Sequence, residues 1–510
     1  MKNQLKIGSV LSYLQMGIGI IIQLFYTPIM IRLLGQSEYG LYNTVASTMS
    51  MLSLLSLGFN SGYIRYYSIY KSNKDKERIS KLNGLYLYIF IIIGFVGLIC
   101  GLFISFHLEL IFDKGLTDQE YAIARILSLL LTFNLAVSFP MSVFMNIISA
   151  HEQFIFMKIV GMIKTICSPL ITLPLLLLGF RSIAMVSVTV GMSLFCDVLY
   201  LWFVLGKMKE KFVFHSFEKG IFANLFKYTI FIAINLVIDQ INWNIDKLLL
   251  GRFKGTTEVA VYSVGFTLYS LYMTFSTSIS GVFTPRIHKI VNKTKDDIFE
   301  QRKALSEIFI KVGRIQFIIL GLIATGVVFF GYYFITVIWA GKGYENSYYV
   351  ALLLIIPASI ALIQNLGIEI QRAENKHQFR SIVYSIMALI NLGISVFLCQ
   401  LYGAVGSAIG TAISLVLANG IIMNIYYNKK CNIDISLFWK NIIRMSFGLI
   451  IPCIVGIFLM YYGLINSNIK FVIFIILYTI IYCLSMWFIS MNDYEKNLIR
   501  QPVLKVFKRF

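Results

Sequence analysis

Long runs of apolar residues alternate with short polar segments along almost the whole chain. A helix that crosses a bilayer needs about 20 mostly apolar residues, and runs of this length occur fourteen times. The predicted spans are 9–33, 39–66, 83–106, 122–148, 159–179, 183–206, 224–250, 259–285, 312–338, 349–370, 381–401, 405–427, 442–464 and 471–490. The pattern predicts an all-α integral membrane protein with fourteen transmembrane helices, whose connecting loops are too short to form a separate domain.

The composition supports a membrane location. Of the 510 residues, 58% are hydrophobic and only 13% are charged, whereas about 25% of the residues are charged in an average soluble chain. A soluble globular enzyme is therefore not expected. The seven cysteines form no CxxC pair and no cluster with histidine, so the sequence predicts neither a zinc site nor a disulfide framework. The first residues lack the pattern of a cleaved signal peptide, so we expect none to be removed.

Lysine and arginine are distributed unevenly between alternate loops. The chain contains 44 Lys and Arg and 24 Asp and Glu, which gives a formal net charge of +20. With a cytoplasmic N-terminus, 33 basic residues fall on inner segments and 8 on outer segments, and basic residues accumulate in the cytoplasmic loops of membrane proteins. We therefore expect both termini in the cytoplasm. The excess positive charge then reflects topology, and no nucleic-acid partner is expected.

Two copies of a short motif indicate an internal repeat. The first span ends on Leu-Leu-Gly and the second begins with Glu-x-x-x-Tyr, and the seventh and eighth spans carry both features again. The motifs are Leu33 to Gly35 with Glu38 and Tyr42, and Leu249 to Gly251 with Glu258 and Tyr262. A further pair of similar short sequences follows the fourth and the tenth spans. Because an offset of six spans preserves orientation, we predict two parallel-related six-helix bundles around a central cavity, followed by an extra C-terminal helix pair.

The repeat also sets the predicted domain boundaries. Residues 1–206 form the N-terminal six-helix bundle, and residues 207–428 form the C-terminal one. Residues 429–510 add the last two helices and a basic cytoplasmic tail. The polar segment 286–311 is predicted to form an amphipathic helix on the inner surface.

The seventh span is the most polar of the fourteen. Asn235, Asp239, Asn242 and Asp246 are spaced by four, three and four residues, so they share one face of a helix. Polar groups within a membrane normally face the protein interior or water. Two carboxylates on one face favour the wall of a water-filled cavity, although a hydrogen-bonded seam between helices also fits. Trp243 beside them is suited to stacking on a sugar ring or to packing against a neighbouring helix.

Polar residues at helical spacing also follow the first, second and eighth spans. The amides are Gln15 and Gln23 on the first span and Asn43 on the second, and the eighth span is rich in Ser and Thr. Such stripes can also mediate helix packing. Since hydroxyl and amide groups hydrogen-bond sugars, four polar stripes, two from the start of each half, predict a cavity that accepts a glycan.

Four basic residues lie towards the inner ends of predicted spans. They are Arg65, Lys164, Arg286 and Arg372. Long basic side chains near a membrane surface can simply extend into the interface. The alternative is a cationic vestibule, because a phosphate-bearing lipid head group is bound through compensating positive charge. Arg65 is the strongest candidate, since Ser61 extends the same helical face.

The chain carries no motif that indicates catalysis. It contains no GxxxxGK[ST] phosphate loop, no HExxH and no GxSxG, and its five histidines are scattered. We therefore expect no enzymatic activity, no cofactor and no bound metal.

Three stretches resemble a known family. PIMIRLLGQSEYGLYN (residues 28–43) resembles the R-x-LG-x-x-EYG-x-Y signature of Wzx-type polysaccharide flippases, a branch of the multidrug/oligosaccharidyl-lipid/polysaccharide exporter superfamily. LSLGFNSGYIRYYS (residues 55–68) is similar to the family's second-helix pattern, with Arg65 at its basic position but Ser56 where Asp is common. IDKLLLGRFKGTTEVAVYSVG (residues 245–265) resembles the junction of the seventh and eighth helices.

The resemblance implies that the protein moves an undecaprenyl-diphosphate-linked oligosaccharide, such as an O-antigen or capsule repeat unit, from the inner to the outer leaflet of the bacterial cytoplasmic membrane by alternating access. It implies contact with membrane lipids and with polymerases and glycosyltransferases of the same pathway. One alternative is a cation-coupled multidrug exporter with Asp239 as its proton site. A second alternative is a membrane polysaccharide polymerase or glycosyltransferase.

Overall fold

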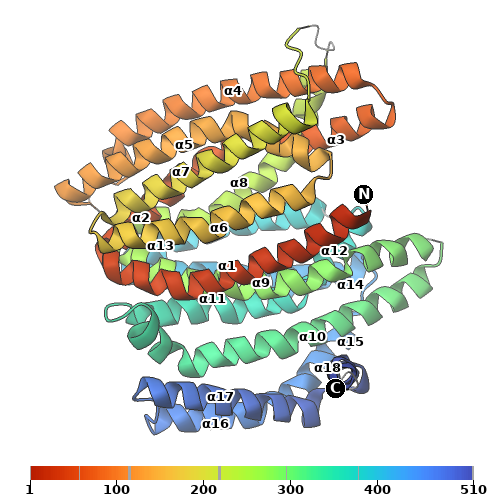
Figure 1. Cartoon of the computed structure of the whole chain (residues 1–510). Coiled ribbons are helices and arrows are strands. Elements are labelled where there is room, and N and C mark those ends of the chain that lie inside the picture. Colours follow the sequence, from red (N-terminus) through yellow and green to blue (C-terminus); the bar gives the residue numbers. More distant parts are fainter. Residues whose placement is uncertain are drawn as a thin grey trace. The chain divides into compact units, whose positions relative to one another are not determined.

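The computed structural model describes residues 2–56, 58–112, 116–215, 220–294, 296–376 and 378–507. These residues are predominantly helical and contain no β-strand, which confirms the all-α class (Figure 1). In chain order the α-helices are α1 (Lys2–Leu34), α2 (Gln36–Met51), α3 (Phe59–Ser72), α4 (Lys76–Phe106), α5 (Asp118–Ala150), α6 (Phe154–Leu177), α7 (Arg181–Trp202), α8 (Ile221–Phe253), α9 (Thr256–Lys293), α10 (Ile298–Tyr333), α11 (Glu345–Ile363), α12 (Leu366–Ala373), α13 (Gln378–Leu415), α14 (Met423–Lys430), α15 (Ile435–Ser446), α16 (Ile450–Tyr461), α17 (Asn468–Ser485) and α18 (Asp493–Phe507).

Within the described residues, ten helical segments are long and apolar enough to cross a membrane. They are Ile7–Leu34, Lys76–Phe106, Asp118–Ala150, Phe154–Leu177, Arg181–Met208, Ile298–Trp339, Glu345–Ile363, Gln378–Lys430, Ile435–Tyr461 and Asn468–Ser490. The chain is therefore a multi-pass membrane protein.

The difference between ten segments and fourteen predicted spans has three sources. The segment Gln378–Lys430 has 53 residues and contains two predicted spans, with a non-helical backbone at Gly403 between them (φ 57°, ψ −134°). The second predicted span is divided between α2 and α3, with 16 and 14 residues, and each is too short to cross a core of about 30 Å alone. The third source is the polarity of α8 and α9, which correspond to the seventh and eighth predicted spans and are not among the ten apolar segments. The count of fourteen therefore stays a prediction.

The second predicted span, 39–66, is not one continuous helix. After α2 the chain forms a 3₁₀ segment, Leu52–Ser56, before α3 begins. Gly58 precedes α3 with φ +69°, in the left-handed region that favours glycine. A Cβ atom at Gly58 would also lie 2.6 Å from Ile232 Cγ2 of α8. Glycine at this position thus permits both the break in the helix and the close approach of α8.

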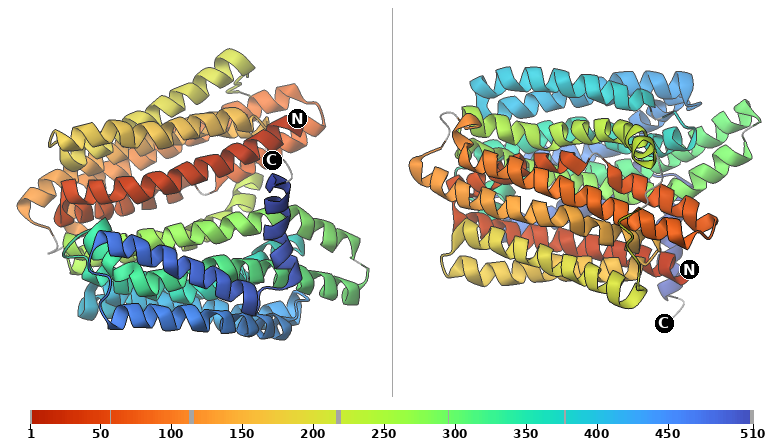
Figure 2. Two further views of the ribbon diagram at one scale, coloured as in Figure 1. Left: turned by 60° about the horizontal axis from the view of Figure 1, so that its bottom comes forward. Right: turned by 90° about the horizontal axis from the view of Figure 1, so that it is seen from above.

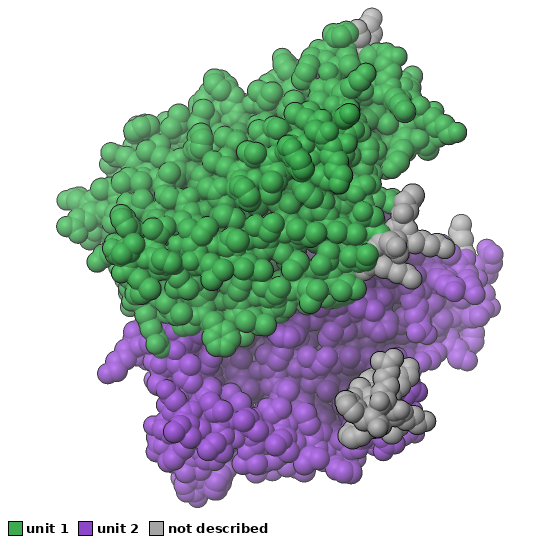
Figure 3. All heavy atoms as spheres, in the orientation of Figure 1, with its two compact units in different colours: residues 1–260 green, residues 261–510 purple. Residues whose placement is uncertain are grey.

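The chain divides into two compact units, residues 1–260 and residues 261–510 (Figure 3). Within each unit the long helices lie side by side with broadly similar axis directions (Figures 1 and 2). In unit 1, α4 and α7 pack against α5, and α1 packs along α6. The repeat assigns α8 to the C-terminal bundle, but α8 packs against α2 and α3 inside unit 1. The predicted domain boundaries at residues 206 and 428 stay a prediction.

A buried aromatic cluster fixes α3 against α4 in unit 1. The rings of Tyr63 and Tyr86 meet edge to face with centroids 5.1 Å apart, and both side chains are fully buried. Tyr63 also donates a hydrogen bond to Asn83 Oδ1 at 2.7 Å. These contacts hold the helix that carries Arg65, which lies on the exposed side of α3.

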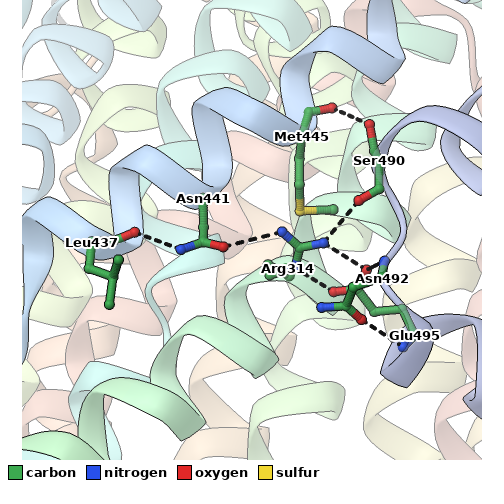
Figure 4. Close-up of polar contacts among 7 residues, drawn as sticks. All are labelled: Arg314, Leu437, Asn441, Met445, Ser490, Asn492 and Glu495. Carbon is green, nitrogen blue, oxygen red and sulfur yellow. Dashed lines mark hydrogen bonds and ion pairs between the residues drawn. The ribbon is translucent and has the colours of Figure 1, made fainter.

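Unit 2 contains a buried ion pair between α10 and α18 (Figure 4). Arg314 binds both carboxylate oxygens of Glu495, with Nη2 at 2.9 Å from Oε2. The same guanidinium donates to the Ser490 carbonyl at 2.9 Å and to Asn441 Oδ1 at 3.4 Å. The side chains of Arg314 and Glu495 are only 7% and 2% exposed. Arg314, which the charge distribution places among the inner loop cations, is therefore part of the core of unit 2.

The predicted amphipathic helix over 286–311 is not a separate element. Its first part continues α9 as far as Lys293, and its last part is the beginning of α10. Asp297 caps the start of α10, because its Oδ1 accepts a hydrogen bond from the Glu300 backbone N–H at 2.9 Å. The polar sequence therefore extends two long helices.

Candidate functional site

A cluster of polar side chains lies between α5, α6 and α7 in unit 1. Lys164 of α6 donates from Nζ to Ser193 Oγ of α7 at 3.3 Å. One turn further along α7, Asp197 accepts from Ser138 Oγ of α5 at 3.4 Å. The positive charge of Lys164 acts on the Asp197 carboxylate. Of the four predicted vestibule cations, Lys164 is thus placed beside an acidic group within the membrane-spanning helices.

Asp197 is not among the predicted site residues, although the sequence carries a signal for it. Asp197 is the only charged residue in the predicted span 183–206, and an ionisable residue inside a membrane helix usually has a functional role. Ser193 precedes it by four residues, so the two side chains share one helical face.

Gln15 lies next to this cluster. A Cβ atom at Gly161 of α6 would be 2.7 Å from Gln15 Nε2, so the amide of Gln15 covers α6 one turn before Lys164. Gln23, further along α1, is partly exposed. Asn43 of α2 donates instead to the Tyr39 carbonyl of its own helix at 2.8 Å. The structure brings Gln15 close to Lys164, and the predicted cavity-lining role of all three amides stays a prediction.

The predicted polar stripe of α8 changes in exposure along its length. Asn235 and Asp239 are exposed, Asn242 is half-buried, and Asp246 is 3% exposed. Trp243 is 40% exposed. The carboxylate of Asp246 therefore belongs to the protein interior of unit 1. A cavity along this face of α8 stays a prediction.

The two remaining vestibule candidates lie in unit 2. Arg286 is exposed on α9. Arg372 of α12 is also exposed, and its Nη1 pairs with Glu369 Oε1 of the same helix at 2.7 Å. An exposed pair within one helix favours a surface role for Arg372. A single cationic vestibule stays a prediction for all four residues, Arg65, Lys164, Arg286 and Arg372.

The glutamate of the EYG signature has a structural role in unit 1. Glu38 of α2 accepts hydrogen bonds from the Ser182 backbone N–H at 2.9 Å and from the Ser182 hydroxyl, and Arg181 Nη1 lies 3.4 Å from its Oε2. Ser182 stands in the first turn of α7, where the backbone N–H groups lack helical partners and attract negative charge. Glu38 is buried, and it therefore fastens α2 to the beginning of α7.

The glycine of the same signature marks a close helix contact. A Cβ atom at Gly40 would lie 1.8 Å from the Thr256 carbonyl oxygen at the beginning of α9, and one at Gly251 would lie 2.6 Å from Thr44 Cγ2 of α2. Thr256 and Gly251 belong to the second copy of the repeated motif. The two motif copies are therefore in direct contact within unit 1.

A polar cavity of about 360 Å³ lies beside this contact. Its wall includes Ser37, Glu38, Glu120 and Arg181. Glu120 Oε1 accepts a hydrogen bond from Thr256 Oγ1 at 2.8 Å, and it also accepts from Ser37 Oγ. Both carboxylates are thus engaged by protein donors, which favours a structural role for this cavity.

Comparison with solved structures identifies the fold. The chain is similar to the lipid II flippase MurJ in an inward closed conformation, with a TM-score of 0.72 and 16% identity, over 97% of this chain and 99% of that one. It is also similar to an inward-facing multidrug resistance MATE transporter, with a TM-score of 0.58 and 13% identity, over 85% and 99% of the two chains. A third similar structure is the MATE multidrug transporter DinF-BH, with a TM-score of 0.58 and 16% identity, over 85% and 96%. The fold is therefore that of the MurJ and MATE membrane transporters.

Sequence comparison identifies the family to which the chain belongs. The family model described as "Polysaccharide biosynthesis protein" matches residues 7–291, and the chain belongs to this family. A relative from Shigella flexneri, named "Putative O-antigen transporter", is 20% identical over 415 residues, which cover 79% of this chain and 92% of the relative. The resemblance found in the signature stretches is confirmed.

Proposed function

We propose that this protein is a flippase that moves a polyprenyl-diphosphate-linked oligosaccharide from the inner to the outer leaflet of the bacterial cytoplasmic membrane. The observation that carries the proposal is membership of the polysaccharide biosynthesis family over residues 7–291. The fold supports it, because the similarity to a lipid II flippase extends over 97% of the chain. The substrate is then a glycan repeat unit, and the enzymes that make and polymerise this unit are its pathway partners.

The charge of the substrate explains why basic residues are needed. A diphosphate carries about two negative charges, and moving each one uncompensated through a low-dielectric space costs several kcal/mol. Arg65 on the exposed side of α3 and Lys164 on α6 supply positive charge on the helices of unit 1. Arginine holds two phosphate oxygens with its planar fork, whereas lysine acts as a point charge.

Complementation tests this proposal. A bacterial strain that lacks its own oligosaccharide flippase should regain surface glycan when it produces this protein together with the matching repeat-unit enzymes. The Arg65→Ala variant should lose export at an unchanged protein level, and Arg65→Lys should restore it in part. Arg78→Ala provides a matched control, because Arg78 is exposed and pairs with Asp75 at the start of α4.

One outcome would contradict the flippase assignment, and another would contradict only the role of Arg65. Absence of surface glycan despite normal protein in the membrane would reject the flippase. Normal export by Arg65→Ala would show that Arg65 only extends into the interface.

The predicted orientation and cavity are tested by cysteine labelling. With both termini cytoplasmic, an impermeant reagent should label a cysteine at Lys342 in intact cells but not one at Lys303. Cysteines at Asn235 and Asp239 should react with small polar reagents, and one at Leu236 should not. Labelling at Lys303 instead of Lys342 would invert the topology.

A cation-coupled multidrug exporter is the second candidate. It is supported by the similarity to MATE transporters over 85% of the chain and by the exposed carboxylate of Asp239 on α8. Production in a drug-sensitive strain separates the two functions, because only an exporter would raise resistance to cationic drugs and lose this effect in Asp239→Asn. We expect unchanged resistance.

A further inference from the structure

Lys164 and Asp197 lie at equal depth in their helices. Lys164 comes ten residues after the start of α6 at Phe154, and Asp197 comes eleven residues before Met208, where the π-helical continuation of α7 ends. At about 1.5 Å per residue, both lie about 15 Å from the same side of unit 1. This is about half of the roughly 30 Å hydrocarbon core.

Charged groups at this depth cost free energy, and the ones that occur usually have a functional role. A buried charge is tolerated only with a close partner and further hydrogen bonds. In this cluster the described hydrogen bonds are single and long, at 3.3 Å for Lys164 and 3.4 Å for Asp197. An ammonium group has three donors and a carboxylate about four acceptor positions. The cluster therefore retains the capacity to bind a further group.

Ser193 holds the Lys164 ammonium one turn away from the carboxylate. Lys164 Nζ donates to the Ser193 hydroxyl, while the Asp197 carboxylate accepts from Ser138 of α5. The ammonium of α6 and the carboxylate of α7 act on each other electrostatically, and Ser193, which binds the ammonium, stands one turn before Asp197 on α7. An anionic group that approaches Lys164 is attracted by the ammonium and repelled by an ionised Asp197.

We propose that Lys164 and Asp197 form a proton-controlled anion site, in which protonation of Asp197 allows Lys164 to bind a phosphate oxygen of the lipid carrier. The inference rests on the proposed function, because it takes the phosphate-bearing lipid as the substrate. The proton balance is simple. One proton from the solvent is taken up at an Asp197 oxygen when the phosphate binds, and one is released when it leaves.

The surrounding groups leave Asp197 as the group that titrates. Both Asp197 and Lys164 act on the thiol of Cys196, on which Cys167 of α6 also acts. Asp197 also acts on the phenol of Tyr200 on α7. Thiols and phenols are ordinarily neutral at neutral pH. From α5 the neighbour is the hydroxyl of Ser138. The acidic residue that α2 brings to α7 is Glu38, at Ser182, fifteen residues before Asp197.

Binding of a defined ligand across pH tests the inference. The probe is a short-chain polyprenyl diphosphate esterified to N-acetylglucosamine, whose diester phosphates do not titrate in the range used. Titration calorimetry on the purified full-length protein, from about pH 5.5 to about pH 8, should show wild-type affinity rising about tenfold towards low pH. Asp197→Asn should bind tightly at every pH, and Lys164→Gln should bind weakly at every pH. Glu307→Gln, which removes an exposed carboxylate on α10, should behave like the wild type.

Ser138→Ala gives an independent readout if Asp197→Asn does not fold. The Ser138 hydroxyl stabilises the ionised carboxylate, so its loss should extend tight binding to higher pH. A wild-type pH response in Asp197→Asn, or an unshifted response in Ser138→Ala, would overturn the inference and leave the flippase intact. No binding of the probe by the wild type at any pH would instead reject the proposed function.

Discussion

Two acid–base arrangements between helices, one in each unit, differ in how completely their charges are satisfied. In unit 2, Arg314 and Glu495 form a two-pronged, buried pair, and the guanidinium also has two further acceptors. In unit 1, Lys164 and Asp197 are partly exposed, and each has one long hydrogen bond to a serine. A saturated pair fixes a structure, whereas an unsaturated pair can change partners. The comparison therefore separates charges that are fully engaged within the protein from charges that retain the capacity to bind a further group.

The largest effect on stability is expected at the saturated pair. Arg314→Ala leaves the Glu495 carboxylate buried without its partner, which should lower the free energy of unfolding by about 3–5 kcal/mol. Unfolding in mixed micelles with increasing SDS measures this change. The double variant Arg314→Met with Glu495→Leu should recover most of the loss, because it removes both charges together. A stable Arg314→Ala protein would contradict the structural role of the pair.

An intermediate effect is expected at Glu38. Glu38→Gln keeps the size of the side chain but weakens the bonds from Ser182 at the beginning of α7. We expect a loss of about 1–3 kcal/mol in the same SDS titration, because the buried donors of Ser182 are left with a weaker acceptor. Gln119→Glu, a nearby charge change of opposite sign on the cavity wall, provides the control. An unchanged midpoint for Glu38→Gln would show that the cap contributes nothing.

A small effect on stability is expected at the unsaturated pair. Asp197→Asn should lower the free energy of unfolding by less than about 1 kcal/mol, since its contacts are long and partly exposed. The same variant should change export, measured as surface glycan in the complementation strain. A loss as large as that of Arg314→Ala would remove the distinction between the two pairs.

The smallest effect is expected at Arg372. Its pair with Glu369 lies within one helix and is exposed, so Arg372→Gln should change stability by at most about 0.5 kcal/mol. Surface glycan should stay at the wild-type level if Arg372 serves only the membrane interface. A clear loss of export with normal stability would return Arg372 to the substrate path.

The fold was more predictable than the pairing of charges. Long apolar runs indicate helices directly, because their length and composition are local properties of the chain. The break before α3 was missed because Gly58 is unremarkable in a membrane helix until its left-handed backbone is seen. The family was predictable from the signature around Glu38, and this glutamate binds the first turn of α7 in the structure.

The candidate site was only partly predictable. Lys164 was predicted as a basic residue towards the inner end of a span, and a search for acidic residues within the spans would also have found Asp197. The pairing of Arg314 with Glu495 could not be found this way, because the two residues are 181 positions apart. Only the contacts that Arg314 makes with Glu495 and with the Ser490 carbonyl show that Arg314 is buried.

The distance along the chain between Arg314 and Glu495 also affects how the protein is made. Arg314 is synthesised 181 residues before Glu495, and ribosomes add about 5–20 residues per second, so roughly 10 to 35 s pass before the carboxylate exists. During this interval the guanidinium must stay at the membrane surface or be shielded by the insertion machinery. Until Glu495 is made and pairs with Arg314, unit 2 lacks the partner of a charge that is buried in the folded protein.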